Sequence, residues 1–181
     1  VIWTNTPKIM KSRKTNLELL LSNHDRKCLS CVRSTTCELQ KLCLEYGVDE
    51  TKFSGEKNQH KIDDASPIIR DNNKCILCRR CVATCKNVQG IGVIGPNNRG
   101  FMSHIGCAFD QDLNDVACVS CGQCIVACPV GALYERDDTD KIREAIADPS
   151  KHVFICTAPS VRAQIGECFG YEPGTDVEGK M

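Results

Sequence analysis

The chain has 181 residues, which is enough for one or two small domains. Its 23 basic and 23 acidic residues give a formal net charge of zero, so the overall charge does not favour nucleic acid or an anionic membrane surface as a partner. No apolar run approaches the length that a membrane-spanning helix needs. Cysteine occurs 15 times, far above ordinary usage, and we expect the function to depend on thiolates.

The cysteine content has three candidate explanations. A secreted disulfide scaffold would begin with a signal peptide, and residues 1–21 contain neither an apolar core segment nor a small-residue cleavage site. An odd number of cysteines also fits poorly with complete pairing. A zinc ribbon uses pairs of Cys-x2-Cys arms, whereas two stretches of this chain add a third cysteine at the same spacing. Such a triplet suits a cubane cluster, because one short loop must reach three of its corners. We therefore predict iron–sulfur clusters in a reducing compartment.

The first 22 residues are predicted to end in a short helix over Thr15–Ser22, with Thr15 or Asn16 as its N-cap. Basic residues cluster before Thr15, and we interpret them as a solvated helix face: Lys8, Lys11, Arg13 and Lys14. The helix leads directly to a histidine that begins the first set of candidate ligands.

Residues 23–66 are predicted to form a subdomain that holds a 4Fe–4S cluster through one imidazole and three thiolates: His24, Cys28, Cys31 and Cys37. The loop supplies only three nearby thiolates, so a fourth ligand is needed, and His24 is the nearest candidate. Cys43 is its competitor, although its place on a helix predicted over 37–46 favours a buried, small apolar role. We expect Gly47 to end that helix and the polar stretch 49–66 to be a loop.

Residues 67–136 contain two complete Cys-x2-Cys-x2-Cys-x3-Cys runs, the second followed by proline. In two-cluster bacterial ferredoxins with this spacing, the fourth cysteine of each run ligates the other cluster. One predicted 4Fe–4S site therefore comprises Cys75, Cys78, Cys81 and Cys128. The other comprises Cys85, Cys118, Cys121 and Cys124. The predicted fold class is α+β, with a histidine-ligated subdomain followed by a bacterial-ferredoxin-like domain.

One further motif match is rejected. The glycines of Gly90-Ile-Gly-Val-Ile-Gly95 satisfy the G-x-G-x-x-G pattern of dinucleotide-binding sites, which requires a helix to follow. A Pro-Asn-Asn turn sequence follows instead, so we expect a turn or strand bend. The remaining cysteines are expected to be core or incidental thiols: Cys107, Cys156 and Cys168.

Residues 137–181 are predicted to begin a larger α/β domain. A helix is expected over 139–147, ended by Pro149. The apolar stretch His152–Thr157 is expected to be a buried strand, and a helix should follow from Ala158. One strand and one helix cannot bury their own apolar faces, which is why we expect further chain to complete this part.

The combined pattern resembles the N-terminal iron–sulfur region of iron-only (FeFe) hydrogenases over essentially the whole chain. The residues that carry the resemblance are 19–31, 37–40, 70–75, 98–101, 105–110, 118–133 and 157–162. The His-x3-Cys-x2-Cys-x5-Cys loop alone is shared with the large iron–sulfur subunit of complex I and with some NAD-linked formate dehydrogenases. The element Thr157-Ala-Pro-Ser-Val-Arg162 is what favours hydrogenase.

The resemblance implies an order of domains: a two-iron domain, the histidine-ligated cluster, the two-cluster unit and the catalytic domain with the H-cluster. On this basis residues 1–22 form a linker helix from an absent upstream domain, and residues 137–181 are the incomplete start of the catalytic domain. The chain lacks the cysteine motifs that hold the H-cluster, so no catalytic residue is expected in it. In the full-length parent, Ala158, Pro159 and Ser160 would line one wall of the H-cluster pocket. Within this segment alone, we expect these three residues only to form the start of a helix.

The expected function is electron relay through three 4Fe–4S clusters, between ferredoxin or an NAD(P)H-oxidising subunit and the H-cluster. The expected location is the cytoplasm of an anaerobic bacterium or a reducing, hydrogen-producing organelle. Two alternatives stay open. The chain could be part of the iron–sulfur subunit of an NADH dehydrogenase or NAD-linked formate dehydrogenase, or it could be a non-catalytic cluster-binding module.

Overall fold

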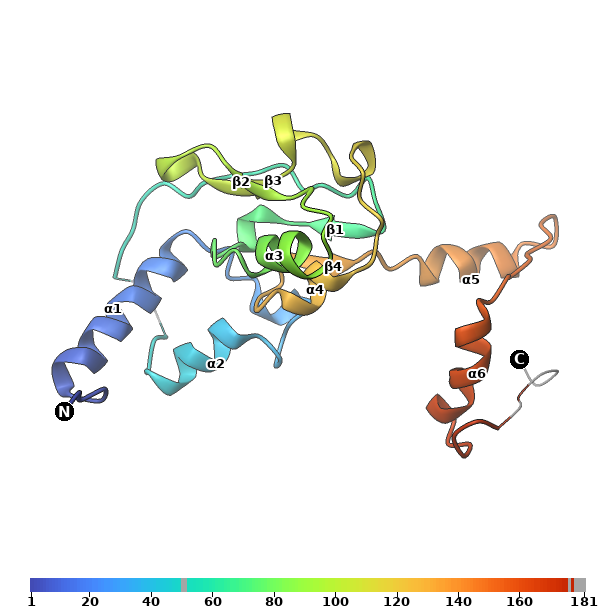
Figure 1. The fold of residues 1–181 in the computed structure, drawn as a ribbon, viewed down its shortest axis with the longest axis horizontal. Coiled ribbons are helices and arrows are strands. Elements are labelled where there is room, and N and C mark those ends of the chain that lie inside the picture. Colours follow the sequence, from blue (N-terminus) through green and yellow to red (C-terminus); the bar gives the residue numbers. More distant parts are fainter. Residues whose placement is uncertain (50–51, 176, 178–181) are drawn as a thin grey trace. The chain divides into compact units, whose positions relative to one another are not determined.

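The computed structural model describes residues 1–49, 52–175 and 177. The chain divides into two compact units, unit 1 from Val1 to Arg136 and unit 2 from Asp137 to Met181, and each is described by itself. Short helices and two small antiparallel sheets make up unit 1, and the described part of unit 2 contains two helices (Figure 1). This content confirms the α+β prediction. No helix of the described chain combines the length and the apolar character needed to cross a membrane.

Helix α1 spans Pro7–Ser22 and is longer than predicted. Its N-cap is Thr6, whose hydroxyl oxygen accepts a hydrogen bond from the Ile9 amide at 3.4 Å, and Pro7 occupies the first turn, where a missing N–H is not needed. The predicted caps Thr15 and Asn16 were wrong, because the lysines and arginine before them are good helix formers that extend the helix toward Thr6.

Helix α2 spans Glu38–Glu45 and packs beside α1 (Figure 1). Leu17 and Leu21 of α1 and Leu39 of α2 are buried where the two helices meet. Gly47 follows α2 with a φ of 60°, a left-handed conformation that favours glycine, and this confirms the predicted helix end.

The rest of unit 1 is built around two antiparallel strand pairs. Strand β1 (Ile68–Arg70) pairs with β4 (Leu133–Glu135), with Ile69 opposite Tyr134. Strand β2 (Gly95–Asn97) pairs with β3 (His104–Gly106) in the connector between the cysteine runs. Helix α3 (Arg80–Ala83) continues into a π-turn over Thr84–Val88 and packs against α4 (Gln123–Ala127).

The predicted turn at the glycine motif is confirmed. Gly90 and Gly92 have φ values of 71° and 70°, and Gly95 begins β2 rather than a helix. The geometry of a dinucleotide-binding βαβ unit is therefore missing from this stretch, as expected.

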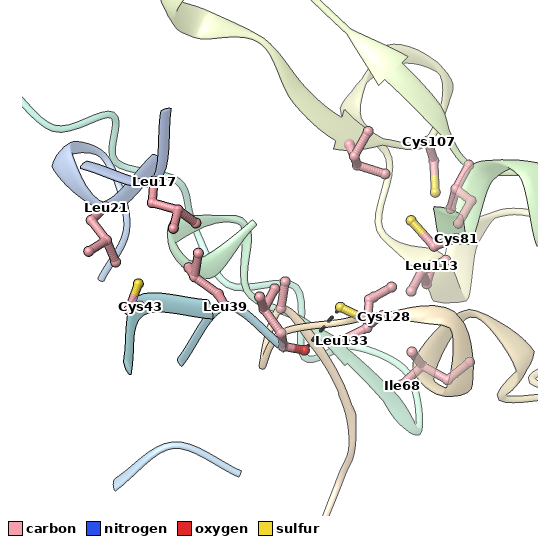
Figure 2. Close-up of a cluster of buried hydrophobic side chains, with 14 of the residues drawn as sticks. Leu17, Leu21, Leu39, Cys43, Ile68, Cys81, Cys107, Leu113, Cys128 and Leu133 are labelled. Carbon is pink, nitrogen blue, oxygen red and sulfur yellow. Dashed lines mark hydrogen bonds between the residues drawn. The ribbon is translucent and has the colours of Figure 1, made fainter. Parts of the chain in front are cut away.

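A single cluster of buried side chains runs through unit 1 (Figure 2). Figure 2 shows Cys43 with the leucines of α1 and α2 at one end and Cys107 at the other. Three candidate ligand or competitor thiols belong to this core: Cys43, Cys81 and Cys128. The cysteine sites therefore border the interior, although each of them also includes one exposed cysteine: Cys28, Cys78 and Cys121.

Unit 2 differs from its prediction at one element. Helices α5 (Thr139–Ala147) and α6 (Pro159–Cys168) form where expected. The stretch His152–Thr157 is not a strand, and Phe154 and Ile155 each remain 88% exposed. A strand needs a neighbour to pair its backbone groups and a layer to cover its side chains, and the described part of unit 2 provides no other strand. The predicted buried strand is therefore wrong for this chain.

Candidate iron–sulfur sites

The twelve candidate ligands gather around three cavities of unit 1, which we call sites 1, 2 and 3. All cysteines are free thiols. The residues of site 1 are His24, Cys28, Cys31 and Cys37. The residues of site 2 are Cys75, Cys78, Cys81 and Cys128. The residues of site 3 are Cys85, Cys118, Cys121 and Cys124. Among the described residues, no three His, Cys, Asp or Glu side chains meet closely enough to hold a single metal ion.

Site 1 is a cavity of about 220 Å³ between the end of α1, the loop over 25–37 and α2. Its lining includes all four predicted ligands and also Cys43. Cys43 is buried, and burial raises the pKa of its thiol, with the nearby Cys37 adding to the shift. The structure therefore brings both candidates for the fourth ligand, His24 and Cys43, to the same cavity.

His24 has the environment of a metal-binding imidazole. The residue is 7% exposed, and within the described chain its Nδ1 atom is buried without a hydrogen-bond partner. Burial lowers the pKa of His24, against the opposing effects of Asp25 and of a hydrogen bond to the Lys74 backbone. A neutral ring with one nitrogen held by a backbone group and the other free is the arrangement that metal-ligating histidines use. His24 also lines the site 1 cavity, where a ligand could bind this unpaired nitrogen.

Gly131 brings the second cysteine run close to site 1. A Cβ atom on Gly131 would lie 2.5 Å from Sγ of Cys31, which is too close for a side chain there. The segment from Cys128 to Gly131 therefore passes directly between two sites, because Cys128 lines site 2 and Gly131 lines site 1. The amide of Glu38 donates to the carbonyl of Pro129 at 3.0 Å and holds α2 against this segment.

Sites 2 and 3 are built by exchange between the two cysteine runs. In each run the first two cysteines lie in a loop, the third lies in the short helix that follows, α3 or α4, and the fourth lies beyond that helix. Since α3 and α4 pack together, each helix carries its fourth cysteine to the loop of the other run. Cys128 accordingly lines site 2 and Cys85 lines site 3.

The two ligand loops share a backbone conformation that the sequence did not reveal. Leu77 and Arg79 in the first run have φ values of 55° and 60°, and Ser120 and Gly122 at the equivalent positions of the second have 51° and 72°. Left-handed residues placed this way turn successive N–H groups inward, which makes the concavities common at Fe–S sites. The amide of Leu77 already donates to Sγ of Cys75 at 3.4 Å. Only Gly122 was a sequence signal for this geometry.

Burial makes several of these thiols reluctant to ionise. It raises the pKa of Cys75 to about 11 and that of Cys81 to about 12, and neighbouring thiols of site 2 add to both shifts. In site 3, burial raises the pKa of Cys124 to about 11. Thiolate is the form that binds iron, so bound cations must supply the stabilisation that the cavity lacks.

The donor sets suit iron–sulfur clusters: four thiolates in each of sites 2 and 3, and three thiolates with one imidazole in site 1. The free Nδ1 of His24 and the space kept open by Gly131 support the same fit at site 1. The cavities of sites 2 and 3, about 20 Å³ each, are narrower than that of site 1.

The predicted H-cluster wall lies in unit 2. Ala158 is the N-cap of α6, and Pro159 and Ser160 form its first turn. All three residues are exposed. The geometry of unit 2 therefore gives them no role beyond starting a helix.

Sequence reasoning missed three residues that contribute to the sites: Gly131, Lys74 and Arg70. Lys74 precedes a ligand of site 2 and its backbone contacts the His24 ring of site 1. Arg70 lines site 2, although it is not a metal ligand and lies on strand β1 rather than in a cysteine loop. Their roles depend on contacts between segments distant in sequence, so no local pattern signals them.

Two family models match unit 1. Residues 13–52 match the NADH-ubiquinone oxidoreductase-G iron–sulfur binding region. Residues 66–134 match the ferredoxin-like domain of NADH-quinone oxidoreductase subunit 3. The first match contains site 1, and the second contains sites 2 and 3.

Two curated relatives match the whole chain. The NADP-reducing hydrogenase subunit HndD of Solidesulfovibrio fructosivorans is 46% identical over 182 residues, which cover 100% of this chain and 31% of that protein. Iron hydrogenase 1 of Clostridium pasteurianum is 37% identical over 184 residues, which cover 100% of this chain and 32% of that protein. Among solved structures, a chain of an NAD+-reducing nickel–iron hydrogenase in its H2-reduced state is similar with a TM-score of 0.68 and 29% identity; the match covers 73% of this chain and 57% of that chain.

These matches define the chain as an iron–sulfur electron-transfer region that includes a ferredoxin-like domain. More particularly, it is homologous over its full length to the N-terminal iron–sulfur region of iron-only hydrogenases. The chain spans about a third of the length of these two curated relatives.

Proposed function

We propose that this chain relays electrons through three 4Fe–4S clusters, at sites 1, 2 and 3, toward the active site of an iron-only hydrogenase. The observation that carries the proposal is the grouping of the cysteines. Two runs with ferredoxin spacing exchange their fourth members, so that each of two cavities has four thiols. Closely spaced clusters replace one long electron transfer by several short ones, and the protein supplies their spacing and environment.

The contacts between the sites support a linear order. Site 1 adjoins site 2 at two places, the Cys128–Gly131 segment and the contact of Lys74 with His24. Site 2 adjoins site 3 through the paired helices α3 and α4. Electrons would therefore pass between sites 1 and 3 by way of site 2. Site 1 would receive them from a redox partner protein, either a ferredoxin or an NAD(P)H-oxidising subunit.

The hydrogenase context is supported by the extent of the matches. The NADH oxidoreductase model for the ferredoxin-like domain ends at residue 134, whereas the matches to the two hydrogenases cover the whole chain. On this proposal unit 2 is the start of a catalytic α/β domain, and Phe154 and Ile155 would be covered by strands and helices of that domain. Ala158, Pro159 and Ser160 would then lie at the H-cluster pocket.

A second candidate function is favoured by the family models. Both describe parts of NADH oxidoreductases, so the same relay could serve an NADH dehydrogenase subunit. A module that binds clusters without relaying electrons to a catalytic partner is the third possibility. We favour the hydrogenase because its matches include unit 2. For a hydrogenase, the location would be the cytoplasm of an anaerobic bacterium or a hydrogen-producing organelle.

Cluster content is the first test. Anaerobic reconstitution of the full chain should give about twelve irons and about twelve labile sulfides, with charge-transfer absorption that dithionite bleaches. About eight of each would remove site 1 from the proposal, and zinc without labile sulfide would refute it.

The chain alone should not evolve hydrogen from reduced methyl viologen. Joining it to the remaining domain of the hydrogenase subunit HndD should restore hydrogen evolution, and no activity in a fully loaded fusion would favour the NADH dehydrogenase candidate.

A further inference from the structure

A buried ion pair lies beside the predicted cluster sites, and the proposed relay does not use it. Nη2 of Arg70 on β1 lies 2.9 Å from Oδ2 of Asp63, and their side chains are only 8% and 6% exposed. The amide of Leu113 donates to the same carboxylate oxygen at 3.0 Å. Backbone hydrogen bonds in both directions between Asp63 and Arg70 fix the loop against the strand.

Arg70 lines one ferredoxin-type site and contacts a buried thiol outside the candidate ligand sets. It lines the cavity of site 2 together with that site's four cysteines. Its Nη1 donates to Sγ of Cys107 at 3.4 Å. Cys107 is fully buried, and burial raises the pKa of its thiol, while the hydrogen bond from Arg70 opposes that rise. The side chain of Arg70 is therefore held in the interior between Asp63 and Cys107, and the residue lines site 2.

The guanidinium also has an unused donor. Within the described part of the chain, Nε of Arg70 is buried and has no hydrogen-bond partner. A buried N–H without an acceptor is unfavourable, and thiolate or sulfide sulfur in the adjoining cavity would be an acceptor. Hydrogen bonds to cluster sulfurs and nearby charge are two of the factors that set the potentials of such clusters.

We propose that Arg70 sets the reduction potential of the cluster at site 2, and that Asp63 limits how far Arg70 raises it. When a reduced partner protein transfers one electron to the cluster at site 2, the charge of the cluster becomes more negative by one and the partner is oxidised by one electron. A cation against the cavity stabilises the reduced form, and it acts strongly because little water screens it. The negative charge of Asp63 opposes this stabilisation of the reduced form. Arg70 has the larger effect on the potential, because Arg70 lines the cavity and Asp63 does not.

This inference rests on the proposed function, because it requires a cluster at site 2. It also has a structural rival, in which the pair only anchors the loop before β1. The electrostatic and the structural roles can be separated. If the role is electrostatic, removing the positive charge of Arg70 and removing the negative charge of Asp63 should shift the reduction potential in opposite directions. A purely structural role gives no such sign reversal.

The test is an anaerobic redox titration of the full reconstituted chain, followed by electron paramagnetic resonance of the reduced clusters. Arg70→Gln should move one of the titration steps to a lower potential. Asp63→Asn should move the same step to a higher potential, because the cation is then uncompensated. Arg70→Lys should stay near the wild type. The matched control is Arg99→Gln, which removes an exposed arginine of the same unit and should change nothing.

Iron and sulfide counts distinguish a failure of the proposed function from a failure of the proposal about Arg70 and Asp63. If the wild type lacks clusters at the ferredoxin-type sites, the proposed function fails and this inference fails with it. If the clusters are present but Arg70→Gln and Asp63→Asn leave every step unchanged, or shift it in the same direction, this inference alone is overturned. If Arg70→Gln does not assemble clusters, Asp63→Asn decides, and the absence of an upward shift refutes the proposal.

Discussion

His24 is buried at the end of α1 beside three candidate thiol ligands, and substitution can test its predicted role. His24→Ala should reduce the reconstituted chain by about four irons and about four sulfides, because site 1 loses a ligand. His24→Cys should keep the metal and lower the potential of this cluster, since a thiolate adds the negative charge that neutral imidazole lacks. Iron analysis and a redox titration measure the two effects.

Cys43 provides the matched comparison for His24, because it lines the same cavity from α2. If Cys43 is a core residue, Cys43→Ala should retain the full iron content and cost only packing stability. Loss of about four irons from Cys43→Ala, with none lost from His24→Ala, would transfer the fourth ligand position to Cys43.

Gly131 is a second position where one residue decides a site. Gly131→Ala should displace Sγ of Cys31, because the added methyl would lie 2.5 Å from it. The expected result is reduced iron at site 1 with sites 2 and 3 still loaded, measured by iron content and by the number of titration steps. Its backbone does not have the left-handed conformation that penalises alanine, so the effect is a steric one.

The control for Gly131 is Gly55→Ala in the loop before β1. A Cβ atom at Gly55 would meet no heavy atom within 4 Å, and its backbone is also unrestricted. Gly55→Ala should therefore leave the iron content unchanged. Equal iron contents in both variants would contradict the steric role of Gly131.

Among the elements, the packing of α1 on α2 supports site 1. Leu17 is 7% exposed and belongs to the core, whereas Leu19 on the same helix is 49% exposed. Leu17→Ala should lower the free energy of unfolding by about 2–4 kcal/mol, and Leu19→Ala by well under about 1 kcal/mol. Urea denaturation of the reconstituted variants, monitored by far-ultraviolet circular dichroism, measures the free energy of unfolding of each. Similar losses from both variants would show that α1 does not depend on this contact.

The elements also show how far sequence patterns predict structure. The ends of α2 and α5 follow the local signals Gly47 and Pro149, the start of α6 follows the expected helix start at Ala158, and these predictions are confirmed. The start of α1 was wrong because Thr15 and Asn16 were chosen as caps, whereas the basic stretch, interpreted as a helix face, continues the same helix back to Thr6. The strand over His152–Thr157 was wrong because a strand depends on partners outside its own sequence.

Across the molecule, iron should hold unit 1 together and leave unit 2 unaffected. Two thiols of site 2 are buried in the unit 1 core and three thiols of site 3 pack partly buried against it, whereas Cys156 and Cys168 of unit 2 are exposed and line no site. Removing iron with a chelator should speed backbone hydrogen exchange around the cysteine loops of unit 1. Exchange in α5 and α6 should stay the same, as measured by mass spectrometry of peptides.

The response of unit 2 is the internal control in that experiment. Faster exchange in α5 and α6 after iron removal would contradict the prediction that iron stabilises unit 1 alone. Unchanged exchange throughout the chain would show that unit 1 folds without metal, against the coupling expected when ligands lie in the core.

The sets of candidate ligands follow from the amino-acid sequence alone, because the spacing within each cysteine run limits what one short loop and one short helix can reach. The structure gathers the same three sets around three cavities, although ligation of clusters there stays a prediction. The resemblance to iron-only hydrogenases also came from the sequence, and the full-length matches confirm it.

How the sites adjoin, and which residues surround them, depends instead on the tertiary structure. Gly131 beside Cys31, Lys74 beside His24, and the Arg70–Asp63 pair are contacts between segments that no local pattern connects. Such contacts arise when elements pack into a shared interior, where a missing methyl group or a buried charge has a large effect because no water is available to compensate.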